Sequence, residues 1–298
     1  METNDYYIYN GCFIFKNEFN KPIDEYIGII RKYNKLTFGS SFNKPLANSL
    51  DKLVNLTGIT FGSKFNVQLG NSLEKLINLR VITFGYEFNK PLGNSFDQLI
   101  KLTHITFGVA FNFRLYNSLG NLINLNKITF GVAFNKPLDN SLDNLINLNK
   151  ITFGHEFNKP LGNSLYNLIN LTELTFGYDF NNPLSETLCY LKKLFHLTLS
   201  YKFLHPLDLP PNIKILSLGC NNQYIIDSLP NSIEELNFDA EFELPLDNLP
   251  SSVKKILFNK KSIYDKPLNN LPKSLELLKL PDDYEFEIEN LPENCKII

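Results

Sequence analysis

The sequence predicts a solenoid of stacked repeats in the α/β class, with a parallel β-sheet along its concave side. Three recurrences predict it. Thr-Phe-Gly begins every 23 residues from Thr37 to Thr175, and Phe-Asn follows in step from Phe42 to Phe180. Beyond residue 200 a Leu-Pro pair recurs every 20–22 residues. A fixed period of this length is typical of an array in which each repeat packs on its two neighbours.

Each regular repeat predicts one short strand. In the repeat that begins at Leu148, Ile151 and Phe153 are apolar and Thr152 between them is polar. Because successive side chains of a strand point to opposite faces, Ile151 and Phe153 are expected in the core and Thr152 on the concave surface. The same pattern along the chain predicts about thirteen strands and a C-terminal stub at residues 297–298.

The convex side of the resulting horseshoe is predicted to carry short α-helical, 3₁₀ or extended segments. In the regular repeats Asn163-Ser164, ahead of an apolar run, fits the N-cap of a single helical turn. The shorter repeats beyond residue 200 have Leu-Pro in that place. Since proline disfavours a helix interior, these repeats predict a thinner and more extended outer side.

The N-terminal residues predict a cap on the sheet. Two apolar and aromatic segments, Tyr6–Tyr9 and Cys12–Phe15, flank Asn10-Gly11, which is the strongest short signal for a β-hairpin. We expect this hairpin to cover the first edge of the sheet. Residues 23–33 place apolar side chains at helical spacing, so the first outer helix is predicted to be longer than the others.

These patterns organise residues 1–298 as one repeat domain. Residues 1–33 hold the hairpin cap and the first repeat, and residues 34–200 hold the regular 23-residue repeats. Residues 201–298 hold the shorter Leu-Pro repeats and the stub. A single repeat cannot bury its apolar face alone, so the stack is expected to form one continuous core.

Two phenylalanine columns and an asparagine ladder are predicted to run through the regular repeats. Stacked aromatic rings gain packing energy beyond the area that they bury. The asparagine that follows the second phenylalanine of each repeat is expected to be buried and hydrogen-bonded to turn backbone. The columns are Phe38, Phe61, Phe84, Phe107, Phe130, Phe153 and Phe176, and Phe42, Phe65, Phe88, Phe111, Phe134, Phe157 and Phe180. The ladder is Asn43, Asn66, Asn89, Asn112, Asn135, Asn158 and Asn181.

The repeated motif resembles a known family. The spelling FGxxFN, as in Phe84 to Asn89, followed by Lys-Pro-Leu, is similar to the FNIP-type leucine-rich repeats of certain protists and giant DNA viruses. The resemblance extends over nearly the whole chain and implies a leucine-rich-repeat solenoid shaped as a horseshoe or ring. Some members carry an F-box ahead of the repeats and look like substrate receptors of ubiquitin ligases. The few residues ahead of the first repeat strand argue against an F-box in this sequence.

Composition and charge indicate which classes of partner and which cellular compartment the sequence favours. The net charge of −2 gives no strong attraction for nucleic acid or for an anionic membrane, although residues 1–200 carry +4 and residues 201–298 carry −6. No apolar run approaches the ~20 residues of a membrane-spanning helix, and the first residues lack the pattern of a signal peptide. Isolated cysteines suit a reducing compartment. We therefore expect a cytoplasmic protein, in the host cytoplasm if the source is viral.

The residues that carry chemistry form no catalytic or metal-binding pattern. No histidine is predicted to lie within range of a serine or cysteine partner, and no Gly-rich phosphate loop is present. The spacing of Cys12, Cys189, Cys220 and Cys295 fits neither a zinc site nor a disulfide framework. The sequence therefore predicts no enzyme activity, no metal and no cofactor.

Variable positions on the concave face are the candidate binding surface. The position after the strand-end glycine is aromatic or apolar over several repeats, which is typical of a protein-binding patch. The alternative is a rim whose side chains only pack on one another. The candidates are Tyr86, Val109, Val132, His155, Tyr178 and Tyr201 on the rim, with His104, Lys127 and Lys150 on the strands.

The leading functional hypothesis is a non-catalytic protein–protein interaction scaffold that binds another protein on its concave face or rim. The alternative is a structural protein that self-associates as a homodimer through the strand edges at the solenoid ends. A substrate-recognition subunit without its own F-box is the third hypothesis.

Overall fold

The structure is a computed structural model that describes residues 5–298. Residues 1–4 lie outside the described residues. They were predicted to belong to the repeat domain and not to begin a signal peptide. The chain divides into two compact units. The N-terminal unit runs to Gly154 and includes Asn163–Leu168, and the C-terminal unit comprises His155–Gly162 and Ile169–Ile298. The single repeat domain over residues 1–298 stays a prediction.

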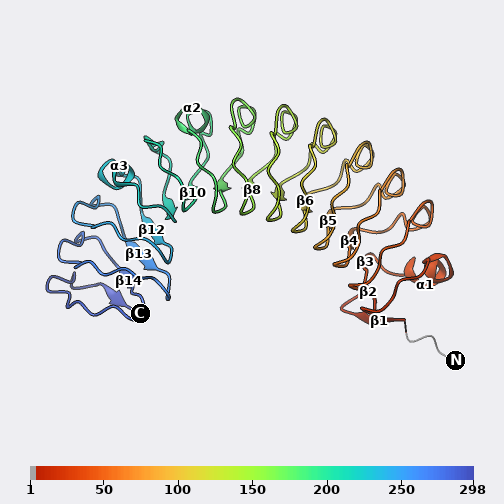
Figure 1. Ribbon diagram of the computed structural model, residues 1–298, viewed down its shortest axis with the longest axis horizontal. Helices are drawn as coiled ribbons and strands as arrows, with labels where there is room; N and C mark the ends of the chain where they lie inside the picture. The colour runs from red at the N-terminus through yellow and green to blue at the C-terminus, as the bar shows by residue number, and fades with distance from the viewer. Residues whose placement is uncertain (1–4) are drawn as a thin grey trace. The chain divides into compact units, whose positions relative to one another are not determined.

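In the N-terminal unit, strands β1–β8 lie side by side in chain order (Figure 1). β1 (Tyr6–Tyr9) is antiparallel to β2 (Cys12–Phe15), and the pairs from β2 to β8 are parallel. The predicted stack of parallel strands and its hairpin cap are therefore confirmed. The remaining strands are β3 (Lys35–Thr37), β4 (Gly58–Thr60), β5 (Val81–Thr83), β6 (His104–Thr106), β7 (Lys127–Thr129) and β8 (Lys150–Thr152).

The hairpin turn and the first outer helix follow the sequence closely. Asn10 and Gly11 both have positive φ, 48° and 71°, which is the backbone of a tight two-residue hairpin turn. A 3₁₀ turn, η1 (Asp24–Tyr26), leads directly into α1 (Ile27–Ile30), so the first outer helical segment is the longest in the described residues, as predicted. The ring of Tyr26 packs edge-on against Phe15, which joins this segment to the cap.

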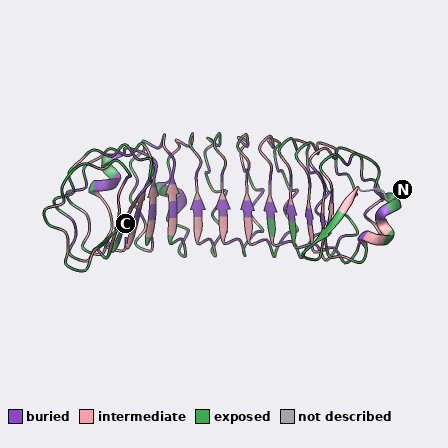
Figure 2. Ribbon diagram, turned by 90° about the horizontal axis from the view of Figure 1, so that it is seen from below, coloured by how far each residue is buried: buried purple, intermediate pink, exposed green. Residues whose placement is uncertain are grey.

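The strand register places equivalent residues of successive repeats beside one another. Thr60 pairs with Thr83, and the same pairing continues through Thr106 and Thr129 to Thr152. In each of these strands the central residue is buried and the threonine is half-buried. Figure 2 shows buried parts of the strands in purple beside half-buried or exposed parts in pink or green. The threonines therefore form a column on the strand face.

Both predicted phenylalanine columns are present. Rings of the first column stack with centroids 5.4–5.7 Å apart between Phe38 and Phe153, and rings of the second lie 6.0–6.1 Å apart between Phe42 and Phe134. Within a repeat the two rings stack more closely, for example 4.1 Å between Phe130 and Phe134. These rings are at most 3% exposed, so the apolar core is a double aromatic stack along the repeats.

The outer side of the regular repeats differs from the expected helical turn. Residues 162–167 and 169–170 lie in turns, and the N–H of Tyr166 donates to the carbonyl of Asn163. The predicted N-cap at Asn163-Ser164 was therefore wrong. In two of the equivalent repeats the serine hydroxyl donates back to a carbonyl three residues earlier, from Ser72 to Leu69 and from Ser95 to Leu92. This local bond competes with helix capping and favours a turn.

The C-terminal unit contains the shorter repeats, and its strands are also parallel and in chain order. An extended outer chain was expected here, but α3 (Gln223–Asp227) occupies one repeat, where it buries Ile225 and Ile226 against the core. A further helix, α2 (Ser185–Leu188), lies in the last 23-residue repeat. The strands are β9 (Glu173–Thr175), β10 (His196–Leu199), β11 (Ile215–Leu218), β12 (Glu235–Phe238), β13 (Lys255–Phe258), β14 (Leu277–Lys279) and β15 (Lys296–Ile297).

The asparagine ladder is hydrogen-bonded between repeats. The side-chain oxygen of Asn89 accepts the backbone N–H of Asn112 at 3.0 Å, and the same bond recurs along the N-terminal unit from Asn43 to Asn135. In the C-terminal unit Asn158 accepts from Asn181 at 3.0 Å. The expectation that these asparagines are buried was wrong, since they are half-buried or exposed. They lie where the chain leaves the strand, at the margin of the sheet.

Replacing Asn89 with alanine is expected to lower the free energy of unfolding by about 1 kcal/mol, because the N–H of Asn112 loses its acceptor in a half-buried position. Asn89→Asp keeps an acceptor oxygen in the same place and is expected to cost less. Urea denaturation followed by circular dichroism measures both changes. An equal loss in the two variants would show that the hydrogen bond is not the source of the effect.

Candidate functional site

The predicted binding residues of the N-terminal unit lie on its strand face and rim. His104 of β6 pairs with Lys127 of β7, which pairs with Lys150 of β8, so three basic or titratable side chains lie on adjacent strands. Tyr86 and Val132 on the rim are exposed, 60% and 40% respectively. Val109 between them is half-buried, and its carbonyl accepts the N–H of Ala133 at 2.9 Å. These residues form a mixed basic and apolar surface.

The predicted residues of the C-terminal unit form a stack of rings. The ring of Tyr178 lies 4.8 Å from His155 on one side and 4.7 Å from Tyr201 on the other. Asp179 bonds to the Nζ atom of Lys202 at 2.6 Å and lies 3.5 Å from Nδ1 of His155. The Nζ atom of Lys202 also lies 5.4 Å from the centroid of the Tyr178 ring. The stack therefore already holds one cation against an aromatic face.

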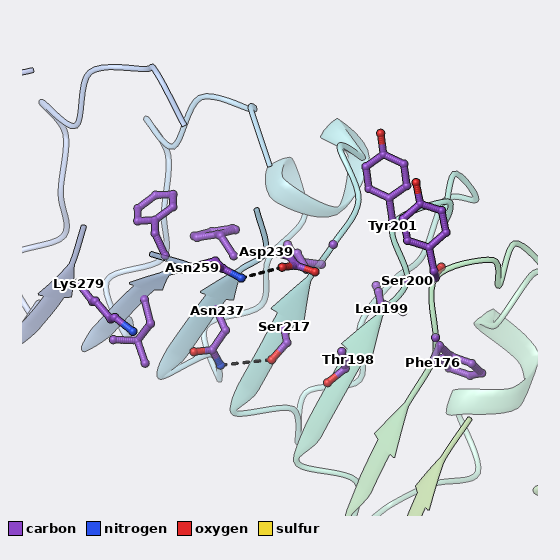
Figure 3. A pocket seen from close by; sticks show the side chains of 17 residues that line it. Phe176, Thr198, Leu199, Ser200, Tyr201, Ser217, Asn237, Asp239, Asn259 and Lys279 are labelled. Carbon is purple, nitrogen blue, oxygen red and sulfur yellow. Dashed lines mark hydrogen bonds between the residues drawn. The ribbon is translucent and has the colours of Figure 1, made fainter. Parts of the chain in front are cut away.

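A hollow of about 540 Å³ opens beside this stack, over strands β10–β14 of the C-terminal unit (Figure 3). Tyr178 and Tyr201 line one end of it. Apolar residues, among them Leu199, Leu218 and Phe258, line part of the rest. Polar residues line the remainder, and these were not predicted as site residues. They are Thr198, Ser217, Asn237, Asp239, Asn259 and Lys279.

The floor of the hollow is formed by the strand position that holds threonine in the regular repeats. Thr198 pairs with Ser217, which pairs with Asn237, and the column continues through Leu257 to Lys279. A sequence signal for this site existed, because the threonine that is constant in the regular repeats gives way here to four different residues. It was missed because only the apolar positions of the shorter repeats were used.

Hydrogen bonds hold the polar side chains of the floor in place. Asn237 donates from Nδ2 to Oγ of Ser217 at 3.2 Å and to Oε1 of Glu235 at 3.2 Å. Asn259 donates from Nδ2 to Oδ1 of Asp239 at 3.1 Å, as drawn in Figure 3. These contacts fix an amide and a carboxylate at the surface of the hollow, where a partner can reach them.

One contact corrects the sequence analysis. No histidine was expected to have a serine partner, but Nε2 of His196 lies 3.3 Å from Oγ of Ser217. Acyl transfer would also need donors aimed at a developing oxyanion. The backbone N–H groups of β10–β12 lie in the plane of the parallel ladder rather than above the strand face. The His196–Ser217 pair therefore belongs to the polar network of the floor, together with Asn237.

The remaining reactive groups include one deeply buried thiol. Burial raises the pKa of the Cys220 thiol to about 11, so the thiol stays protonated at neutral pH. Within residues 5–298, no cluster of three or more His, Cys, Asp or Glu side chains is placed to hold a metal ion. The helices of the same residues are too short and too polar to cross a bilayer.

A second surface that sequence reasoning missed lies on the outer turns of the N-terminal unit. One aliphatic residue per repeat is 42–51% exposed there. Asparagine side chains bond neighbouring turns beneath it, as Asn124 does to the carbonyl of Ile100 at 2.8 Å. The signal was an apolar residue at a fixed position next to the buried leucines. The exposed column is Val54, Ile77, Ile100, Ile123 and Ile146.

Comparisons with known proteins place the fold. The FNIP Repeat family model matches residues 202–240 and 221–261. The solved structure described as CroV588, a novel circular LRR protein, is 26% identical with a TM-score of 0.67, and the match covers 98% of this chain and 50% of that one. The chain thus spans about half the length of that protein.

Two more distant structures are similar in fold alone. An internalin, inlF of Listeria monocytogenes, is 13% identical with a TM-score of 0.53 over 96% of this chain and 86% of its own. TLR13, solved in complex with ssRNA13, is 15% identical with a TM-score of 0.59 over 92% of this chain and 48% of its own. No curated protein matches the sequence.

Proposed function

We propose that this leucine-rich-repeat chain, which carries FNIP repeats over residues 202–261, is a non-catalytic scaffold that binds a partner protein in the hollow of its C-terminal unit. The observation that carries the proposal is the hollow itself. It combines an aromatic end wall, Tyr178 and Tyr201, with fixed amide, hydroxyl and carboxylate groups on its floor. Aromatic anchors beside such polar groups are the usual composition of a protein interface.

The charge around the hollow favours a protein over a nucleic acid. Asp239 lines it, and Glu241 and Glu243 lie close enough to Tyr201 to raise the pKa of its phenol. Residues 201–298 carry a net charge of −6. Because a polyanion would be repelled by these carboxylates, phosphate backbones are poor candidates for this surface.

The proposal is tested by filling the hollow. Ser217→Lys places a long side chain on its floor, and Lys279 occupies the same column in β14, so the sheet accommodates lysine at this position. The chain is used to capture proteins from cells of its source, and each partner is identified, purified and titrated by calorimetry. We expect Ser217→Lys to weaken binding at least about tenfold, which is ~1.4 kcal/mol.

Two controls separate this surface from the others. Thr60→Lys makes the same change at the equivalent position of β4 in the N-terminal unit and is expected to leave binding within about twofold. Val109→Asp with Val132→Asp tests the predicted rim of the N-terminal unit. A partner that binds Ser217→Lys as tightly as the wild type rules out the hollow, and loss confined to the Val109 and Val132 change assigns binding to the rim.

A second candidate function, self-association, is favoured by the edge strand β1. Tyr7, Ile8 and Tyr9 of this strand are 50%, 40% and 64% exposed. An edge with apolar side chains is a surface on which a second strand can pair. Light scattering distinguishes this function, because a mass that doubles with concentration in the wild type and not in a Tyr7→Lys, Tyr9→Lys variant supports it.

A further inference from the structure

The aromatic stack of the C-terminal unit ends at Tyr201. The two rings before it, His155 and Tyr178, each occupy the rim position of their repeat. In the next two repeats that position holds Cys220, which is 1% exposed, and then Ala240. No ring of the described residues therefore continues the stack on the far side of Tyr201, and the hollow opens where the next ring would lie.

The backbone beside Tyr201 leaves this space open. Gly219 lies against the backbone of Tyr201, where an added Cβ would be 3.0 Å from its nitrogen. Gly219 has no side chain and the Cys220 thiol is buried, so neither residue places a side chain over the aromatic end of the hollow. Figure 3 shows Tyr201 at the upper edge of the hollow, with Ser217 below it and Asp239 to its left.

Two carboxylates lie at this same end. The carboxylate of Glu241 lies close to the hydroxyl of Tyr201, and its proximity raises the pKa of the phenol. Asp239 lines the hollow, and its Oδ1 atom accepts from Asn259 at 3.1 Å and from the N–H of Ala240 at 2.8 Å. Both carboxylates are exposed, so an incoming hydrogen-bond donor can reach them from solvent.

The opposite end of the hollow has the opposite charge. Lys279 of β14 lies four strands from β10, roughly 19 Å away at ~4.8 Å per strand. Figure 3 likewise shows Lys279 at the far side from Tyr201. A cation is therefore favoured at the Tyr201 end and disfavoured at the Lys279 end.

The stack itself provides an internal example of the same chemistry. Lys202 lies over the face of Tyr178 while Asp179 holds its Nζ atom at 2.6 Å. One aromatic ring and one carboxylate thus position a cation from within the chain. At Tyr201 a ring face and two carboxylates are present, and no lysine or arginine of residues 5–298 makes a cation–π contact with that ring.

We infer that the hollow takes an arginine side chain of the partner protein, stacked on the open face of Tyr201 and hydrogen-bonded to Asp239 and Glu241. This inference rests on the proposed function and names the group that the hollow recognises. A guanidinium is planar, so it extends a stack of rings, and its fork of N–H groups matches two carboxylates better than an ammonium does. An aromatic side chain would fit the stack but would offer no donor to the remaining acceptor positions of the two carboxylates.

A tripeptide probe tests the inference without knowledge of the partner. Acetyl-Gly-Arg-Gly-amide is titrated into the full chain labelled with ¹³C in its tyrosine rings, and the Tyr201 signal is assigned from Tyr201→Phe. We expect a saturable shift of this signal with a Kd on the order of millimolar, as one anchored side chain provides. The lysine tripeptide is expected to bind at least about threefold more weakly, and the neutral citrulline tripeptide is expected not to bind.

Variants locate the probe. Tyr201→Leu is expected to abolish the binding, and Asp239→Asn with Glu241→Gln is expected to weaken it at least about fivefold. Tyr86→Leu, at the equivalent rim position of the N-terminal unit, is the matched control and is expected to change nothing. The inference is overturned by an absent or unsaturable shift, by equal binding of the citrulline tripeptide, or by insensitivity to the loss of the two carboxylates.

The two proposals fail separately. If Ser217→Lys abolishes partner binding but the arginine tripeptide does not bind, the hollow is the interface and the arginine assignment is wrong. If the tripeptide binds at Tyr201 but the partner is unaffected by Ser217→Lys, the proposed function is wrong.

Discussion

Phe130→Ala is expected to lower the free energy of unfolding by about 3–5 kcal/mol, the usual cost of removing a fully buried phenylalanine. The Phe130 ring is 3% exposed and stacks on three others. Its centroid lies 4.1 Å from Phe134, 5.7 Å from Phe107 and 5.5 Å from Phe153. Since each of these rings is held by its own strand or loop, the neighbours cannot close the cavity without shifting a whole repeat. Urea denaturation followed by circular dichroism measures the loss.

The matched control is Lys136→Ala in the outer part of the same repeat. Lys136 follows the second phenylalanine column and contributes nothing to either stack, so its change is expected to stay within about 0.5 kcal/mol of the wild type. If Lys136→Ala destabilised the protein as much as Phe130→Ala, the assignment of inward and outward positions in the repeat would be wrong.

The strands and the aromatic core could be predicted because the motifs that form them recur many times in the sequence. Thr-Phe-Gly and Phe-Asn recur at one spacing, and a spacing shared by consecutive repeats fixes which residues lie beside one another. Thr83 beside Thr106 and Phe84 beside Phe107 follow directly. In a repeat protein the period of the sequence therefore predicts which residues of adjacent strands pair, which a sequence without repeats does not.

The outer turns could not be predicted in the same way, because local bonds decide between a turn and a helix. A Ser before an apolar run fits an N-cap equally well whether its hydroxyl bonds forward to an N–H or back to a carbonyl. In this chain Ser95 bonds back to Leu92, and the segment forms turns. The burial of the asparagine ladder was predicted wrongly for a related reason. The repeat spacing indicates which residues bond to one another, but it does not indicate how far each side chain lies below the surface.

The candidate site was half predicted. Tyr178 and Tyr201 were identified from the rim column, which keeps its period up to residue 201. The floor residues lie beyond that point, where repeat lengths vary between 20 and 22, and the register of Ser217 with Asn237 depends on those lengths. The contact of His196 with Ser217 joins residues 21 positions apart on neighbouring strands. Such a diagonal contact follows from the register and not from any local motif.

Gly108→Ala is expected to destabilise the chain by about 3 kcal/mol or more, although it adds only one methyl group. A Cβ at this position would overlap the carbonyl oxygen of Gly85 and lie 2.5 Å from its carbonyl carbon. Gly85 is the equivalent residue of the preceding repeat, and its own Cβ would overlap the carbonyl oxygen of Gly62 in the same way. The strand-end glycines therefore stack backbone on backbone. The obstacle is main chain, so no side-chain rotation relieves it and the repeats must move apart.

Gly58→Ala is the control that separates this steric effect from the general properties of glycine. Gly58 lies on the strand face of β4, where an added Cβ would meet only the Lys35 side chain at an ordinary 3.5 Å, and its partner in β5 is Val81. Alanine should fit there and stabilise the chain by about 0.5–1 kcal/mol, because glycine loses more conformational freedom on folding. Thermal and urea unfolding of the two variants should thus move in opposite directions. If Gly108→Ala were as stable as the wild type, adjacent repeats would have to lie further apart at their strand ends than the carbonyl contacts between Gly62, Gly85 and Gly108 require.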